Sequence, residues 1–186
     1  MNIGKLEKNL RDLILEEQIK LGYRKELLRL YYPLSSLNHL LGVNCTEAEM
    51  LERMKEFSEA TQEHFGGITA SAKKELFCIQ IPPEGVEYVH EHQGEDDFLV
   101  RFIGTISQHG CTLQDVEKLF AEYSDDVFEG SYEGDDFDYV FYFRDSKPND
   151  YRYCITFEGC HVIYHRFTPE DYVDFDFGEV TPVACS

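Results

Sequence analysis

The chain has 186 residues, of which 36 are acidic and 17 are basic, so its formal net charge is −19. Hydrophobic residues make up 42% of it and aromatic residues 14%, enough apolar surface to offset the entropy cost of folding, which excludes intrinsic disorder. No apolar run reaches the roughly 18 to 20 residues of a membrane span, and the N-terminus MNIGKLEKNL lacks a signal-peptide core. We expect a cytoplasmic protein with no membrane partner.

The first helix is predicted over residues 3–21, where leucines and isoleucines form one stripe and Gly22 follows as a C-terminal cap. Its charged face carries the i,i+4 pairs Glu7 with Arg11 and Glu16 with Lys20. Alternation predicts a strand over Leu27–Tyr32, which Pro33 stops. A short helical turn is expected over Leu34–Leu41.

The next segments are predicted to be a helix and a hairpin. Thr46 and Glu49 form a capping box, so we predict a helix from Glu47 to about Phe65. From Ala72 the period changes to two, and the alternation of Phe77, Ile79 and Ile81 with polar or smaller residues indicates a strand. The sequence PPEG then predicts a turn, and Val86, Tyr88 and His90 are expected to begin the return strand.

Two further helices precede an aromatic β-meander. Asp96 or Asp97 is predicted to cap a helix over Phe98–Ile106, and Thr112 another over Leu113–Tyr123. The stretch Phe137–Phe167 reads as three antiparallel strands, the first with Phe137, Tyr139, Phe141 and Phe143 on one face. A Glu158-Gly159 turn would pair Phe157 with Cys160, Ile155 with Val162 and Tyr153 with Tyr164. That register places Arg152, Thr156, His161 and His165 on the face opposite the apolar one.

These elements predict an α+β protein, with an antiparallel sheet of hairpins and a meander and about four helices packed on one side. The length suits a single domain over residues 1–186. The only candidate for a division into two lobes is QGEDD at residues 93–97.

The negative charge is concentrated in the C-terminal half. Residues 96–186 hold six Lys or Arg and twenty Asp or Glu, a net charge of −14. This charge repels phosphate backbones, so nucleic acid is not an expected partner, although helix, turn, helix and meander follow the order of a winged helix-turn-helix. A basic protein partner fits the charge.

The acidic segment Asp125–Asp138 is the first candidate site. Read as a calcium loop from Asp125, it has Gly130 at the sixth position, but Val127 stands at the third and Asp136 at the twelfth, so the pattern fails. The carboxylates remain candidates for docking a partner, and less strongly for loose cation binding. The docking candidates are Asp125, Asp126, Glu129, Asp135 and Asp136.

Histidines give the second candidate site. His90 and His92 would share one face of a regular strand, as metal-binding His-x-His pairs do, but further ligands would be needed. The sequence contains no GxSxG, HExxH or SxxK motif and no glycine-rich phosphate loop, so no cofactor is expected. An enzyme or small-molecule binder could still use a Tyr- and His-lined pocket between sheet and helices, with His90, His92, His161 or His165.

The N-terminal stretch LGYRKELLRLYYPLSSLNHLLG, preceded by KLEKNLRDLILEEQ, resembles a small family of anaerobic-bacterial proteins known only as a domain of unknown function. The resemblance covers nearly the whole chain. It implies a stand-alone bacterial cytosolic protein and transfers no activity, ligand or catalytic residue. From the residues we therefore favour a non-enzymatic interaction module over an enzyme, and the oligomeric state stays open.

Overall fold

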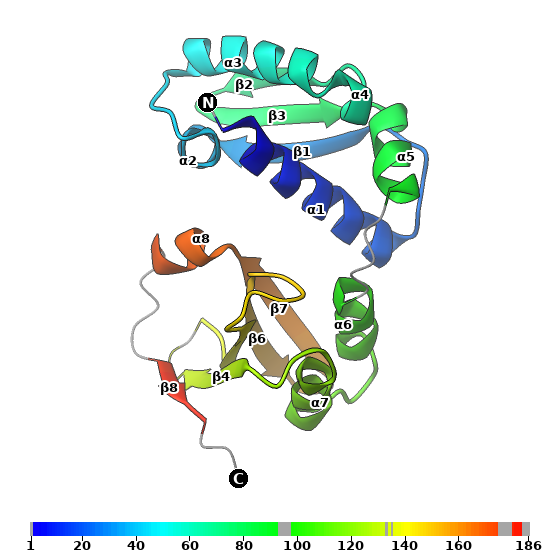
Figure 1. Ribbon diagram of the computed structural model, residues 1–186, viewed down its shortest axis with the longest axis vertical. Coiled ribbons are helices and arrows are strands. Elements are labelled where there is room, and N and C mark those ends of the chain that lie inside the picture. Colours follow the sequence, from blue (N-terminus) through cyan, green and yellow to red (C-terminus); the bar gives the residue numbers. More distant parts are fainter. Residues whose placement is uncertain (1, 93–97, 133, 135, 175–179, 184–186) are drawn as a thin grey trace. The chain divides into compact units, whose positions relative to one another are not determined.

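The computed structural model describes residues 2–92, 98–132, 134, 136–174 and 180–183 (Figure 1). The chain divides into two compact units, Met1–Glu95 and Asp96–Ser186. The described residues form eight helices and two antiparallel sheets, so the α+β class is confirmed, whereas the prediction of about four helices was too low. No described helix combines the length and hydropathy needed to cross a bilayer.

The N-terminal unit contains five helices and a three-stranded sheet of order β1-β3-β2. Its elements are α1 (Ile3–Leu21), β1 (Leu28–Pro33), α2 (Leu34–Leu41), α3 (Glu47–Ala60), α4 (Gln62–Phe65), β2 (Thr69–Lys73), β3 (Leu76–Ile81) and α5 (Pro83–Glu91). The structure confirms the helices predicted from the sequence at α1 and α2 and the strand predicted at β1. The helix expected to run from Glu47 to Phe65 is instead interrupted at Thr61, whose hydroxyl donates to the Phe57 carbonyl.

One face of this sheet is apolar and buried. Phe77, Ile79 and Ile81 of β3 are fully buried, and the antiparallel register sets them opposite Tyr32, Leu30 and Leu28 of β1. Leucines of α1 and α2 and methionines of α3 belong to the same core. On the other face, Tyr31 is 63% exposed, so the helices of this unit pack on one side of its sheet.

The predicted return strand at Val86–His90 is wrong, because this segment is the helix α5. Proline suits the first helical position, where its missing N–H costs nothing, and Pro83 stands there. Val86 and Val89 are buried at helical spacing. Gly85 lies so close to the backbone of Phe65 that a Cβ atom would collide with it.

The hairpin of this unit lies earlier in the chain than the predicted one, because β3 pairs with the preceding strand β2. Its two-residue turn is Lys74-Glu75, and both residues have positive φ, 54° and 62°. Such turns usually contain Asn or Gly, so these residue types gave no turn signal.

The C-terminal unit has a five-stranded antiparallel sheet of order β7-β6-β5-β4-β8. Its elements are α6 (Phe98–Ile106), α7 (Leu113–Tyr123), β4 (Val127–Tyr132), β5 (Tyr139–Phe143), β6 (Arg152–Glu158), β7 (His161–Phe167), α8 (Pro169–Asp174) and β8 (Val180–Pro182). Both predicted helices and the three-stranded meander are confirmed. The expected caps Asp96 and Asp97 and the lobe boundary at residues 93–97 lie outside the described residues.

The register of the β6–β7 hairpin differs from the predicted one by a shift of two residues. Phe157 pairs with Val162 and Glu158 with His161, which leaves Gly159 and Cys160 in the turn. Gly159 has a φ of 62°, which suits the first position of a two-residue hairpin turn. Because side chains alternate with a period of two, this shift keeps every side chain on its predicted face.

Aromatic rings fill the space between this sheet and α6 and α7. The Phe120 ring lies 5.0 Å from the rings of Phe141 and Phe143, and the Phe102 ring lies 4.8 Å from Tyr153. All five of these side chains are buried. Such contacts add to the burial of apolar area and specify how the helices sit on the sheet.

The opposite face of the sheet carries a smaller apolar cluster beside its polar residues, which the sequence did not predict. Val140 and Cys154 are buried there, and Tyr172 of α8 packs against them. Phe137 precedes β5 and stacks on Tyr132 in this second cluster, rather than sharing a face with Phe141. The helices of this unit therefore do not all lie on one side.

We predict that Phe120→Ala lowers the free energy of unfolding of the C-terminal unit by about 3 to 5 kcal/mol, because it removes a fully buried ring from close-packed neighbours. Denaturant unfolding followed through the amide signals of β6 measures the change, with signals of β3 as the internal reference. Val100→Ala, at a 45% exposed position of α6, is the control and should change stability by less than about 0.5 kcal/mol. A loss below about 1 kcal/mol for Phe120→Ala would contradict the packing described.

Candidate functional site

The acidic segment after α7 is not one loop, because β4 runs through its middle. Asp125 and Asp126 lie in the turn before β4, and Asp136 lies in the connection that follows it; all three are exposed. A six-residue strand spans roughly 20 Å, so the two ends are too far apart to share an ion. Asp135 lies outside the described residues. Asp126 also forms an exposed ion pair of 3.7 Å with Arg144.

Gly130 occupies a position in β4 with no room for a side chain. A Cβ atom there would collide with Val180 of β8 and with the ring of Phe128. This close strand packing explains the glycine without a calcium loop. Among the described residues, no group of three or more His, Cys, Asp or Glu side chains is arranged to hold a metal ion.

Glu129 differs from the other docking candidates because it is half-buried on the helix-facing side of the sheet. It pairs in register with Phe141, and its carboxyl group lies beside that of Glu117 on α7. Burial, together with the negative charge of Glu117, raises the pKa of Glu129 to about 7. Its Oε1 atom is buried and has no hydrogen-bond partner among the described residues.

Within each unit, the histidines named from the sequence do not come together. On α5, residues two positions apart point to different sides, so His90 and His92 do not form a His-x-His metal pair. The His90 ring stacks on Tyr23 at 3.9 Å, and the His92 ring stacks on Tyr88 at 4.1 Å. His161 and His165 are exposed residues of β7 in the other unit, opposite Glu158 and Cys154 in register.

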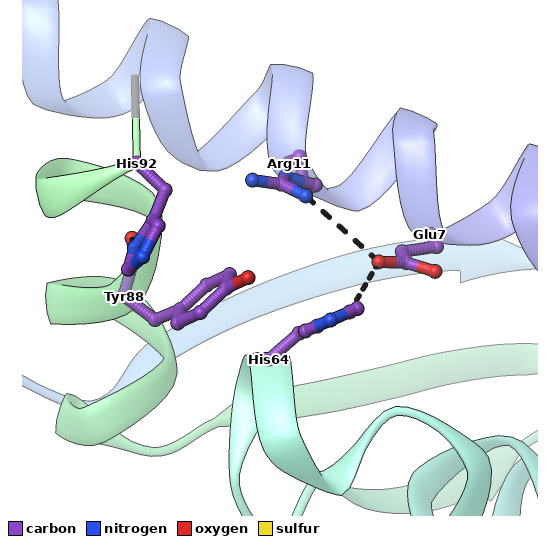
Figure 2. Close-up of polar contacts among 5 residues, drawn as sticks. All are labelled: Glu7, Arg11, His64, Tyr88 and His92. Carbon is purple, nitrogen blue, oxygen red and sulfur yellow. Dashed lines mark hydrogen bonds and ion pairs between the residues drawn. The ribbon is translucent and has the colours of Figure 1, made fainter. Parts of the chain in front are cut away.

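A histidine that the sequence did not single out makes a close polar contact instead. His64 of α4 places Nδ1 2.6 Å from Oε1 of Glu7 on α1 (Figure 2). The same Glu7 oxygen lies 3.9 Å from the guanidinium of Arg11, the pair expected from their i,i+4 spacing. The partners Glu7 and His64 are 57 residues apart, so no local pattern could have indicated their contact.

Tyr88 of α5 completes this cluster. Its ring stacks on His64 at a centroid distance of 5.1 Å and lies 5.5 Å from the Arg11 guanidinium carbon. Figure 2 shows the Tyr88 side chain between His92 and His64. The cluster joins α1, α4 and α5, which gives its residues a structural role in holding the three helices together.

The Glu7 contact also has a chemical consequence for the imidazole. A carboxylate at Nδ1 favours the tautomer with its proton on that nitrogen and leaves Nε2 as the acceptor. His92 is held similarly, since its Nδ1 lies 2.9 Å from the Tyr88 carbonyl oxygen. Each ring thus has Nε2 available for proton transfer or for ligation.

We predict that Glu129→Gln stabilises the C-terminal unit at high pH. A raised carboxyl pKa means that the folded state binds the proton more tightly than the unfolded state, so stability falls as pH rises from about 4.5 through about 7. The variant lacks this loss. Its stability relative to the native chain should be greatest above pH 7 and should shrink below pH 4.5, as measured by denaturant unfolding across this range. Asp125→Asn removes one charge from an exposed turn and is the matched control; equal pH profiles for the two variants would contradict the assignment.

We predict that His64 is mainly the Nδ1–H tautomer when neutral and that Glu7→Ala removes this preference. Long-range ¹H–¹⁵N correlation spectra of the imidazole distinguish the two nitrogens directly. Glu59→Ala, at an exposed position of α3, should leave the His64 signals unchanged. A native His64 with its proton on Nε2 would show that the Glu7 contact does not persist in solution.

Comparison with known proteins identifies a family and no activity. No curated protein and no solved structure matches the chain. Residues 3–175 match the model of a family described as a domain of unknown function, E. rectale gene description, DUF3877. This match covers both units and agrees with the resemblance noted in the N-terminal sequence. The chain belongs to the DUF3877 family.

Proposed function

We propose that the protein is a non-enzymatic interaction module whose acidic C-terminal unit docks a basic partner protein. One observation carries the proposal. The unit from Asp96 to Ser186 has twenty acidic and six basic side chains, so its acidic side chains exceed its basic ones by fourteen. An excess of this size gives a field that attracts a basic surface.

The placement of the arginines in this unit supports the proposal. Arg101 pairs with Glu122, and Arg144 pairs with Asp126. Arg152 lies 3.7 Å above the Tyr142 ring, and its guanidinium also donates to the carbonyl oxygen of Asp150. These arginines each contact one aromatic ring or one carboxylate, so they do not neutralise the remaining acidic residues of the unit. The exposed Asp125 and Asp136 therefore contribute to a negative surface.

The docking surface is proposed to include Asp125, Asp126 and Asp136. Glu129 is half-buried beside Glu117, so its contribution depends on its protonation. Exposed charges of this kind act mainly on the association rate and on specificity. The same field disfavours nucleic acid, whose phosphates it would repel.

The alternative, an enzyme or small-molecule binder with a Tyr- and His-lined pocket that uses His90, His92, His161 or His165, is less favoured by the geometry within each unit. His90 and His92 point to different sides of α5, and the other two histidines are exposed on β7. We therefore do not propose a reaction at these residues.

The test is capture of partners on the immobilised full-length chain at about 0.05 M and about 0.5 M salt, followed by affinity measurements with each purified partner. The variant Asp125→Asn, Asp126→Asn, Asp135→Asn, Asp136→Asn should weaken binding at low salt by at least about tenfold, because attraction to a basic surface scales with the charge removed. The control neutralises four exposed glutamates of α3 and α4 in the other unit, Glu52, Glu56, Glu59 and Glu63, each to Gln. Binding that is insensitive to salt, or equally weakened by both variants, would contradict the proposal.

A further inference from the structure

The N-terminal unit contains a cavity of about 140 Å³ that is open to solvent on one side, near the C-terminal end of α1. Its apolar lining comes from α1, from the segment that leads into β1, and from α5: Ile14, Leu21, Leu27, Leu28 and Val86. Apolar cavities of about 150 Å³ in proteins accommodate a molecule the size of benzene. The space therefore suits a compact molecule of about six or seven heavy atoms.

A buried amide lies in the wall of this cavity. Gln18 is only 9% exposed, and its Nε2 donates to the carbonyl oxygen of Val86 at 2.8 Å. Its Oε1 atom is buried and has no hydrogen-bond partner among the described residues. An unsatisfied buried acceptor is costly, so the site favours an occupant that brings an N–H or O–H donor.

Charged residues of the lining favour a cation. Glu17 and Glu26 contribute two negative charges and Arg24 one positive charge, which leaves a net charge of −1 around the cavity. The whole unit from Met1 to Glu95 has eleven basic and sixteen acidic residues, a net charge of −5. Both net charges favour a cationic ligand over an anionic one.

We propose that this cavity binds a small protonated amine with a compact hydrocarbon body. The hydrocarbon contacts the leucines, Ile14 and Val86, while the ammonium group donates to Gln18 Oε1 and lies near Glu17 and Glu26. The terminal torsion of a Gln side chain is soft, so a small rotation turns Oε1 toward the cavity. This site lies within one unit and is independent of the proposed docking surface.

Titration of the full-length chain with cyclohexylamine tests the proposal, with the Gln18 side-chain amide and the Val86 backbone amide as NMR reporters. Cyclohexanol and cyclohexanecarboxylate have the same ring with a neutral and an anionic head group. We expect saturable shifts at both reporters and binding of the amine at least about tenfold tighter than that of the carboxylate, because the head groups differ by two unit charges. Absence of saturation for the amine, or tighter binding of the carboxylate, would overturn the proposal. The cavity would then have no role as an amine site.

Two variants separate the contributions. Glu17→Gln with Glu26→Gln should weaken amine binding about fivefold and leave cyclohexanol binding unchanged, as expected for partly exposed charges. Gln18→Leu should weaken both the amine and the alcohol, since both donate to Oε1. Glu52→Gln removes a charge from an exposed position of α3 and is the control. Equal weakening of the amine by the control and by the double variant would overturn the assignment to this cavity, even if Gln18→Leu failed to fold.

Discussion

The C-terminal sheet has a buried apolar cluster on each face, and this constraint limits where its unit can place charge. Phe120 and its neighbouring rings cover one face, and the cluster around Val140 and Cys154 covers the other. Transfer of a charged group into the ring layer around Phe120 would carry a large desolvation cost. Of the acidic residues that the structure describes in this unit, most lie in turns, on helices or at strand ends. Glu129 is the partial exception, and its raised pKa reflects the cost of that position.

Much of the fold could be predicted because local signals and burial agree. Capping residues such as Thr46 and Thr112 mark true helix starts, and the period-two alternation around Phe77 and Phe141 marks true strands. The sequence does not reveal the helix α5, because Val86, Tyr88 and His90 alternate by coincidence and the two prolines that start it are also typical of a turn. The strand β4 was missed because its acidic neighbours dominate the composition of that segment.

The sites were harder to predict than the fold because their parts are distant in sequence. Glu7 and His64 meet only when α1 packs beside α4, and no spacing rule encodes this. In the sequence, Gln18 looks like any polar residue of an amphipathic helix. Only the structure shows that its amide donates to the Val86 carbonyl. Asp125 and Asp136 could be recognised as acidic, but their separation by a strand could not. Composition thus predicted the charge of the C-terminal unit and little about its arrangement.

The strand β8 lies beyond the segment that the family model matches, yet it completes the sheet. It pairs with β4 from Gly130 to Tyr132, and the Val183 amide donates to the Glu129 carbonyl at 3.1 Å. Unpaired strand borders invite uncontrolled association between molecules. A recombinant fragment trimmed to the shared family boundary would leave the backbone groups of β4 open along one side, so β8 protects this border of the sheet from pairing with another molecule.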